Sequence, residues 1–123
     1  MAAPNFLSLT TINGKATGVA LTTAAATIIN NAALSGKCLK VNTLIVSNID
    51  GTNSADVTIN YYTLDDIGGT AYAIAKTVAV GPDSSLVVID KNSPIYLEED
   101  KSIGGLASAN GDLEVVASWE DMS

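Results

Sequence analysis

Apolar side chains recur at every second position through most of this chain, and this spacing is the feature that most constrains its fold. In the clearest run, 38–48, one face carries Leu39, Val41, Thr43 and Ile45, and the other carries Lys40, Asn42, Leu44 and Val46. Successive side chains of a β-strand point to opposite faces, so this period of two predicts a strand. Because the second half of the run is apolar on both faces, we expect that half to be buried on both sides.

Turn-forming residues divide the rest of the chain into short segments of the same kind. We expect strands at 17–22, 27–30, 38–48, 56–64, 70–80, 86–89, 95–97, 103–109 and 113–119. The loop 50–55 indicates a hairpin between its flanking strands, and Asn110-Gly111 is typical of a two-residue type I′ hairpin turn. Short strands at this spacing predict an all-β protein, an antiparallel β-sandwich of about eight strands with jelly-roll or immunoglobulin-like topology.

The N-terminal third gives a weaker pattern. The run Ala24-Ala25-Ala26 is compatible with a helix over 20–34, but frequent Thr and Ile and the absence of charged residues favour two strands there. The segment 13–18 has two glycines spaced by four and is interpreted as a turn. We expect residues 1–8 to form an N-terminal arm, with Phe6 as its large anchor, and residues 9–123 to form a single domain.

The side chains available for a core are small. Ala, Gly, Ser and Thr make up 50 of the 123 residues, and only six residues are aromatic. A folded chain of this mass exposes roughly 6,200 Å², enough burial for one core. A thin core of Ala, Val and Ile indicates a two-layer protein that gains further stability from neighbouring molecules.

Composition also limits the chemistry. The chain has no His, no Arg and one cysteine, Cys38, which excludes His-dependent nucleophilic sites, His-based zinc sites and a disulfide within the chain. We therefore expect no enzyme activity, no cofactor and no metal. A net charge of −7 with six scattered lysines disfavours nucleic acid. The start of the sequence does not have the pattern of a signal peptide, and no apolar run is long enough for a membrane span, so we expect a protein made in a reducing cytoplasm.

Several segments together carry a resemblance to a known class of proteins. They are Ala26-Thr27-Ile28-Ile29, Ser35-Gly36-Lys37, Leu39-Lys40-Val41, Ile45-Val46-Ser47-Asn48, Asp56-Val57-Thr58-Ile59, Ser85-Leu86-Val87-Val88, Ile95-Tyr96-Leu97-Glu98-Glu99-Asp100, Ser102-Ile103 and the end Ser118 to Ser123. The chain resembles the small all-β virion proteins of tailed bacteriophages, especially marine and cyanobacterial phages, and the sandwich modules of their decoration and fibre proteins.

This resemblance implies a structural role in the virion. It implies a capsid decoration (cement) protein on the exterior of the head, which is made in the host cytoplasm, binds the major capsid protein or other virion proteins and forms a homo-oligomer. A neck, tail or fibre protein is the alternative within the virion. A carbohydrate-binding, adhesin-like module is the alternative outside that class.

Two segments are candidate partner-binding sites. Phe6 and Leu7 of the arm are suited to docking on a neighbouring subunit, where a fully buried side chain contributes about 1.5–3 kcal/mol; the alternative is a disordered terminus. The acidic end with Trp119, Glu120 and Asp121 is suited to a basic patch on a partner.

Other motifs favour ordinary structural roles. The loop 50–56 does not have the spacing of a calcium-binding EF-hand, and 65–66 and 98–100 are interpreted as solvated acidic turns. Cys38 is expected to pack near a strand start. For Tyr61, Tyr62, Tyr72 and Trp119, core packing is preferred over a subunit interface or a sugar platform, with Tyr61 facing the core and Tyr62 the opposite face. Gly104-Gly105 indicates a bulge or a sheet corner.

Overall fold

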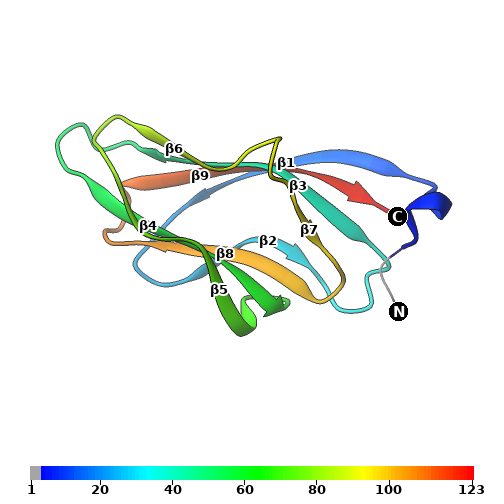
Figure 1. Ribbon diagram of the computed structural model, residues 1–123. Helices are drawn as coiled ribbons and strands as arrows, with labels where there is room; N and C mark the ends of the chain where they lie inside the picture. Colours follow the sequence, from blue (N-terminus) through cyan, green and yellow to red (C-terminus); the bar gives the residue numbers. More distant parts are fainter. Residues whose placement is uncertain (1–3) are drawn as a thin grey trace.

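Two antiparallel β-sheets pack face to face in the computed structural model, which describes residues 4–123 (Figure 1). The strands are β1 (Ile12–Ala20), β2 (Ala26–Asn31), β3 (Cys38–Asn48), β4 (Ala55–Leu64), β5 (Gly68–Val80), β6 (Ser85–Ile89), β7 (Ile95–Leu97), β8 (Lys101–Ala107) and β9 (Leu113–Met122). A 3-10 turn, η1 (Phe6–Ser8), precedes them. The predicted all-β antiparallel sandwich is confirmed. No helix forms over 20–34, where β1 ends at Ala20 and β2 spans Ala26–Asn31.

The order of the strands defines the topology. One sheet, called here the β3 sheet, has the order β1-β9-β3-β6, and β7 also pairs with β3. The other, the β4 sheet, has the order β2-β8-β4-β5. Most connections pass from one sheet to the other, and β9 and β8 each insert between strands from the first half of the chain. This is the double-sheet arrangement of a jelly roll, and of the two predicted topologies it is the one that fits.

Both predicted hairpins are wrong. The loop after β3 leads to β4 in the opposite sheet, and the loop with Asn110-Gly111 likewise connects β8 to β9 across the sandwich. Gly111 has a φ of +82°, but Asn110 does not have the positive φ that a type I′ turn needs. Turn-forming residues signal that the chain reverses, but they do not specify which sheet receives the next strand.

The segment 13–18 is also not a turn. It lies inside β1, which pairs with β9 along its whole length, from Ile12 opposite Met122 to Ala20 opposite Glu114. Gly14 and Gly18 sit there in ordinary strand positions, and their spacing alone misled the prediction. The correction matters because it places Lys15 on a strand at the edge of the β3 sheet.

The core lies between the sheets and consists mainly of aliphatic side chains. Those with the largest buried volume are Leu21, Ile29, Leu44, Ile59, Ile89, Leu97, Ile103 and Leu113. The folded chain exposes 6218 Å², in agreement with the area expected from its mass. In β3, an irregularity in the pairing with β9 between Val41 and Thr43 shifts the alternation, so that Leu39 and Val41 and then Leu44 and Val46 are buried. This shift, rather than burial on both faces, explains the two apolar phases of the run 38–48.

At Gly104 and Gly105, β8 runs close to the backbone of both neighbouring strands, β2 and β4. A Cβ at Gly104 would be 2.6 Å from the Ala26 carbonyl oxygen, and a Cβ at Gly105 would be 2.9 Å from that of Thr58. The bulge predicted at Gly104 and Gly105 is not in β8, which pairs with β4 in regular register. The register shift lies instead in β2, between Thr27 and Ile29.

The N-terminal segment contacts the end of the chain. Phe6 packs against Tyr96 with ring centroids 5.4 Å apart, and the backbone amides of Thr10 and Thr11 both donate to the Ser123 carbonyl at 2.8 and 2.9 Å. Of the predicted arm 1–8, residues 1–3 lie outside the described part of the structure. The described part of the arm therefore packs on its own chain through Phe6, while Leu7 is 96% exposed.

Candidate functional site

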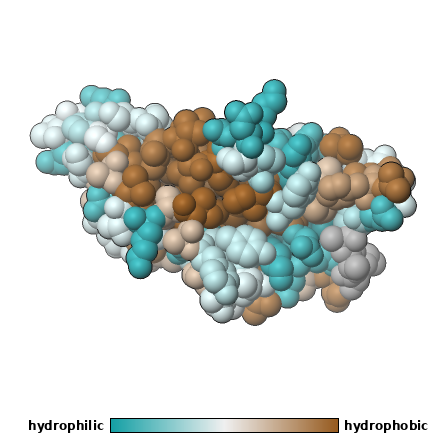
Figure 2. All heavy atoms as spheres, viewed as in Figure 1, coloured by the Kyte–Doolittle hydropathy of each residue, from teal (hydrophilic) through white to brown (hydrophobic). Residues whose placement is uncertain are grey.

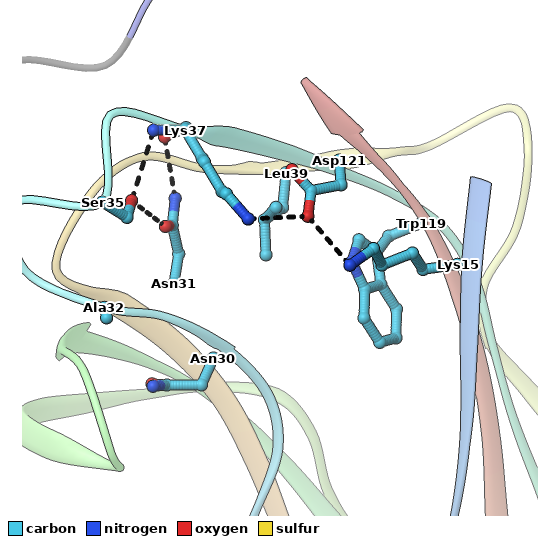
Figure 3. Close-up of a pocket in the computed structure, with 9 residues that line it drawn as sticks. All are labelled: Lys15, Asn30, Asn31, Ala32, Ser35, Lys37, Leu39, Trp119 and Asp121. Carbon is cyan, nitrogen blue, oxygen red and sulfur yellow. Dashed lines mark hydrogen bonds and ion pairs between the residues drawn. The ribbon is translucent and has the colours of Figure 1, made fainter. Parts of the chain in front are cut away.

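A pocket of about 270 Å³ opens on the flank where β1 and β2, the outer strands of the two sheets, are neighbours (Figure 3). Among the described residues, no strand lies between β1 and β2 to cover this opening between the two sheets. The lining residues come from β1, β2, the loop after β2, β3 and β9: Lys15, Asn30, Asn31, Ala32, Ser35, Lys37, Leu39, Trp119 and Asp121.

Three charged groups meet in this pocket. The ammonium groups of Lys15 and Lys37 lie 3.4 Å and 3.3 Å from the same atom, Oδ2 of Asp121 (Figure 3). The Asp121 side chain is only 9% exposed, whereas the two lysine side chains remain nearly half exposed. The cluster carries two positive charges and one negative charge, so the pocket has a net positive charge in a chain whose total is −7.

Asn31 fixes the loop that brings Lys37 to the pocket. Its buried side-chain amide donates to the carbonyl oxygens of Lys37 at 2.9 Å and of Leu97 at 3.0 Å, and its oxygen accepts a hydrogen bond from the Ser35 hydroxyl. Buried amides that are fully hydrogen-bonded hold their surroundings rigidly. Lys37 is therefore presented to Asp121 from an ordered loop.

The predicted contact residues of the C-terminal segment are divided by the structure. Trp119 and Asp121 point toward the pocket, and Asp121 is already paired with two lysines of its own chain. Glu120 lies on the opposite face of β9, 3.9 Å from the ammonium of Lys40. The sequence prediction treated these three residues as one acidic surface, but alternation along β9 separates them.

Sequence reasoning missed Lys15 and Lys37. The two glycines around Lys15 indicate a turn, and a turn gives Lys15 no inner or outer face. In a strand, Lys15 lies on the same face as Val19, which points inward. A lysine on the inward face would have indicated an acidic partner, because a charge turned toward the core requires one.

A second surface feature lies on the opposite flank, where β5 and β6 are the outer strands. Figure 2 shows apolar side chains gathered across the middle of the molecule, between β6 and β5 as seen in Figure 1. The partly buried hydrophobic side chains on β5, β6 and β7 that pack against the core are Ile74, Ala75, Val78, Leu86, Val88 and Ile95. We call this group the apolar flank.

The acidic turns make local hydrogen bonds. Asp50 accepts from the Thr52 amide at 2.8 Å and from the Asn53 side chain at 3.3 Å. The Thr52 contact is the main cause that lowers the pKa of the Asp50 carboxyl below 3.8. Asp100 accepts from the Asp65 amide at 3.1 Å, which ties the two acidic turns together. Within residues 4–123, no group of three or more His, Cys, Asp or Glu side chains is arranged to hold a metal ion.

Cys38, Tyr61 and Tyr62 have packing roles, whereas Tyr72 does not. Cys38 starts β3 and is 3% exposed, as predicted, and burial followed by the charge of Glu98 raises the pKa of its thiol. Tyr61 packs partly buried against the core, and burial raises the pKa of its hydroxyl. Tyr62 is on the opposite face as predicted, yet it is only 7% exposed because it lies over Gly104. Tyr72 is 61% exposed, so the core packing predicted for it is wrong.

Comparisons with known proteins give a fold but no family. No family model matches the chain, and no curated protein matches it. Among solved structures, the chain is similar to one from Bacillus endospore appendages, described as a novel family of disulfide-linked pili. The TM-score is 0.52 at 18% identity, over 89% of this chain and 85% of that one. At this identity the similarity shows a shared fold. No helix formed by residues 4–123 is long and apolar enough to cross a membrane.

Proposed function

We propose that this protein is a structural subunit of a larger assembly and that it contacts further copies of itself through the apolar flank. The observation that carries the proposal is the exposure of core-type side chains along the edges β5 and β6, where Val78 and Val88 are partly open to solvent. Contiguous apolar surface on a small protein marks an interaction site. An edge between two sheets is also a place where another chain can cover unpaired backbone groups.

A stable contact needs only a small part of the exposed surface. A standard interface buries about 800 Å² on each partner, roughly an eighth of the 6218 Å² that this chain exposes. Each apolar square ångström removed from water contributes about 25 cal/mol before the costs of association. Two copies repel each other through their net charge of −7, so added salt should favour the assembly by screening that repulsion.

The fold similarity supports a second copy as the occupant of the flank. The structural neighbour comes from endospore appendages that are described as disulfide-linked pili. A protein without His, Arg or a second cysteine is also better suited to contact than to catalysis. We therefore propose a non-catalytic role that involves neither nucleic acid nor a membrane.

Within this class, we propose decoration of the exterior of a tailed-phage head, bound to the major capsid protein. The sequence resemblance to phage virion proteins supports this position, and an acidic outer surface suits a protein kept away from packaged DNA. A pilus-like filament is the second candidate, because the structural neighbour favours it.

Copy number and shape distinguish the two candidates. Mass spectrometry of purified particles should find hundreds of copies of a head decoration protein in a fixed ratio to the major capsid protein. A dozen copies or fewer would indicate the neck or tail instead. Regular filaments of the purified protein in electron micrographs, together with its absence from particles, would replace the decoration proposal with the filament.

A further inference from the structure

The pocket between β1 and β2 has more hydrogen-bond donors than its own residues use. Each lysine ammonium has three N–H donors, and within the described residues Lys15 and Lys37 share one acceptor atom of Asp121. The oxygen of the Asn30 side chain accepts from the Asp66 amide at 2.8 Å, but its NH₂ group donates to no described residue. Spare ammonium donors therefore reach the opening from β1 and from the loop after β2, whereas the Asn30 side chain points away from them toward the β4–β5 turn (Figure 3).

The charge of the pocket selects a monoanion. Two ammonium groups and one carboxylate leave a single positive charge, which one carboxylate of a ligand would neutralise. A phosphate dianion would leave the pocket with a net negative charge inside a chain of −7. Lysine binds anions as a point charge, without the fork geometry that favours phosphate on arginine.

The remaining lining residues point to more than a bare carboxylate. Asp121 supplies a carboxylate, and the half-buried indole of Trp119 supplies an apolar wall with its own N–H. Sugar hydroxyls both donate and accept hydrogen bonds, and a sugar ring also presents C–H groups to an apolar wall. The volume of about 270 Å³ is just below the roughly 300–1,000 Å³ of pockets for drug-sized ligands, so it suits a single sugar residue.

We propose that this pocket binds one acidic sugar residue of the uronic acid class, with its carboxylate accepting from the ammonium N–H groups of Lys15 and Lys37 that Asp121 does not use, and its ring beside Trp119. The site is independent of the apolar flank, because the two lie on opposite flanks of the sandwich. The proposal therefore stands or falls separately from the assembly role. A protein carboxylate in the same place is the competing occupant.

Trp119 is the single tryptophan of the chain, so its signals report on the pocket directly. The probes are methyl glucuronide, methyl galacturonide, methyl glucoside and acetate, titrated to about 50 mM while tryptophan fluorescence and the indole N–H resonance are followed. A ligand of this size gives a dissociation constant in the low millimolar range. We expect saturable binding of at least one uronide, and at least tenfold weaker binding of the glucoside and of acetate.

Two variants test the geometry. Lys15→Met and Lys37→Met should each raise the dissociation constant of the uronide about tenfold or more, since each removes a charge-assisted hydrogen bond. Lys76→Met is the matched control, because Lys76 is exposed on β5 at the far edge of the other sheet, and it should leave binding within about twofold. Thermal unfolding of each variant checks that it is folded.

Three outcomes overturn the proposal. Acetate that binds as tightly as either uronide would assign the pocket to a bare carboxylate, such as a side chain of a protein partner. The absence of saturation by both uronides in both measurements would show that no such site exists. Equal binding by folded Lys15→Met and by the unsubstituted protein would exclude the proposed placement of the carboxylate.

Discussion

The sharpest test of the packing concerns Gly104, where β8 passes beneath residues of the β4–β5 turn. A Cβ added there would lie 2.5 Å from Ile67 Cγ2 and 2.6 Å from the Ala26 carbonyl oxygen. The Ile67 side chain can rotate away, but the carbonyl belongs to the backbone of β2, which pairs with β8 at this point. Gly104→Ala must therefore move one strand relative to the other.

The cost follows from overpacking. Inserting a methyl group into a closely packed region costs about 1–3 kcal/mol, and we expect the upper part of this range because a backbone atom is involved. The loss of chain entropy in the unfolded state returns about 0.4–1 kcal/mol. A net destabilisation of about 2 kcal/mol corresponds to a Tm lower by about 8 °C, from an unfolding entropy of about 2.1 cal/mol/K per residue over 123 residues.

Gly14→Ala is the matched control. Gly14 is also a strand residue, but a Cβ there meets no atom within 4 Å. Thermal and urea unfolding should therefore show this variant to be as stable as the unsubstituted protein, or slightly more stable. If Gly104→Ala were equally harmless, the close approach of β8 to Ala26 would be refuted.

Three further predictions concern single side chains. Because the Thr52 amide lowers the pKa of Asp50, the ionised carboxyl stabilises the fold above about pH 4 and loses this effect as the pH falls through its lowered pKa. In urea unfolding, Asp50→Asn should therefore lower the stability of the protein at pH 7 and lower it progressively less toward pH 2. A difference in stability that does not depend on pH would contradict this. Both carboxylate oxygens of Glu99 are buried without a hydrogen-bond partner among the described residues. Glu99→Met should therefore raise the free energy of unfolding by about 1–2 kcal/mol. A loss of stability in this variant would show that the carboxylate has a partner. Because its pKa is raised, Cys38 should react with iodoacetamide at pH 8 far more slowly in the folded protein than in urea, and equal rates would show that the thiol is accessible.

The strands were predictable because each is specified by its own residues. Alternation places Val57 and Ile59 on the inner face of β4 from the local sequence alone. The pairing of β9 joins residues 94 to 110 positions apart with β1 and 65 to 84 positions apart with β3, and no local pattern carries that information. For the same reason the loops before β4 and β9 were mistaken for hairpin turns.

The pocket could not be predicted from the sequence for a related reason. Lys15, Lys37 and Asp121 converge only because β1 and β9 are neighbours and because the loop after β2 folds back over them. The sequence did indicate that Trp119 and Asp121 were of interest, but as an outward surface. Knowledge of the strand pairing changes that interpretation, since it turns both side chains toward the flank.

The central claim is that the protein works by self-association through the apolar flank, and sedimentation velocity of the purified chain tests it most directly. We predict that the protein forms an oligomer, that salt favours it, and that Val78→Lys dissociates it. Val116→Lys is the control, because it places the same substitution on a valine that is 58% exposed on the outer face of β9, and the oligomer should persist in this variant. A monomer at every concentration and salt condition, or an oligomer that survives Val78→Lys and dissociates in Val116→Lys, would contradict the claim.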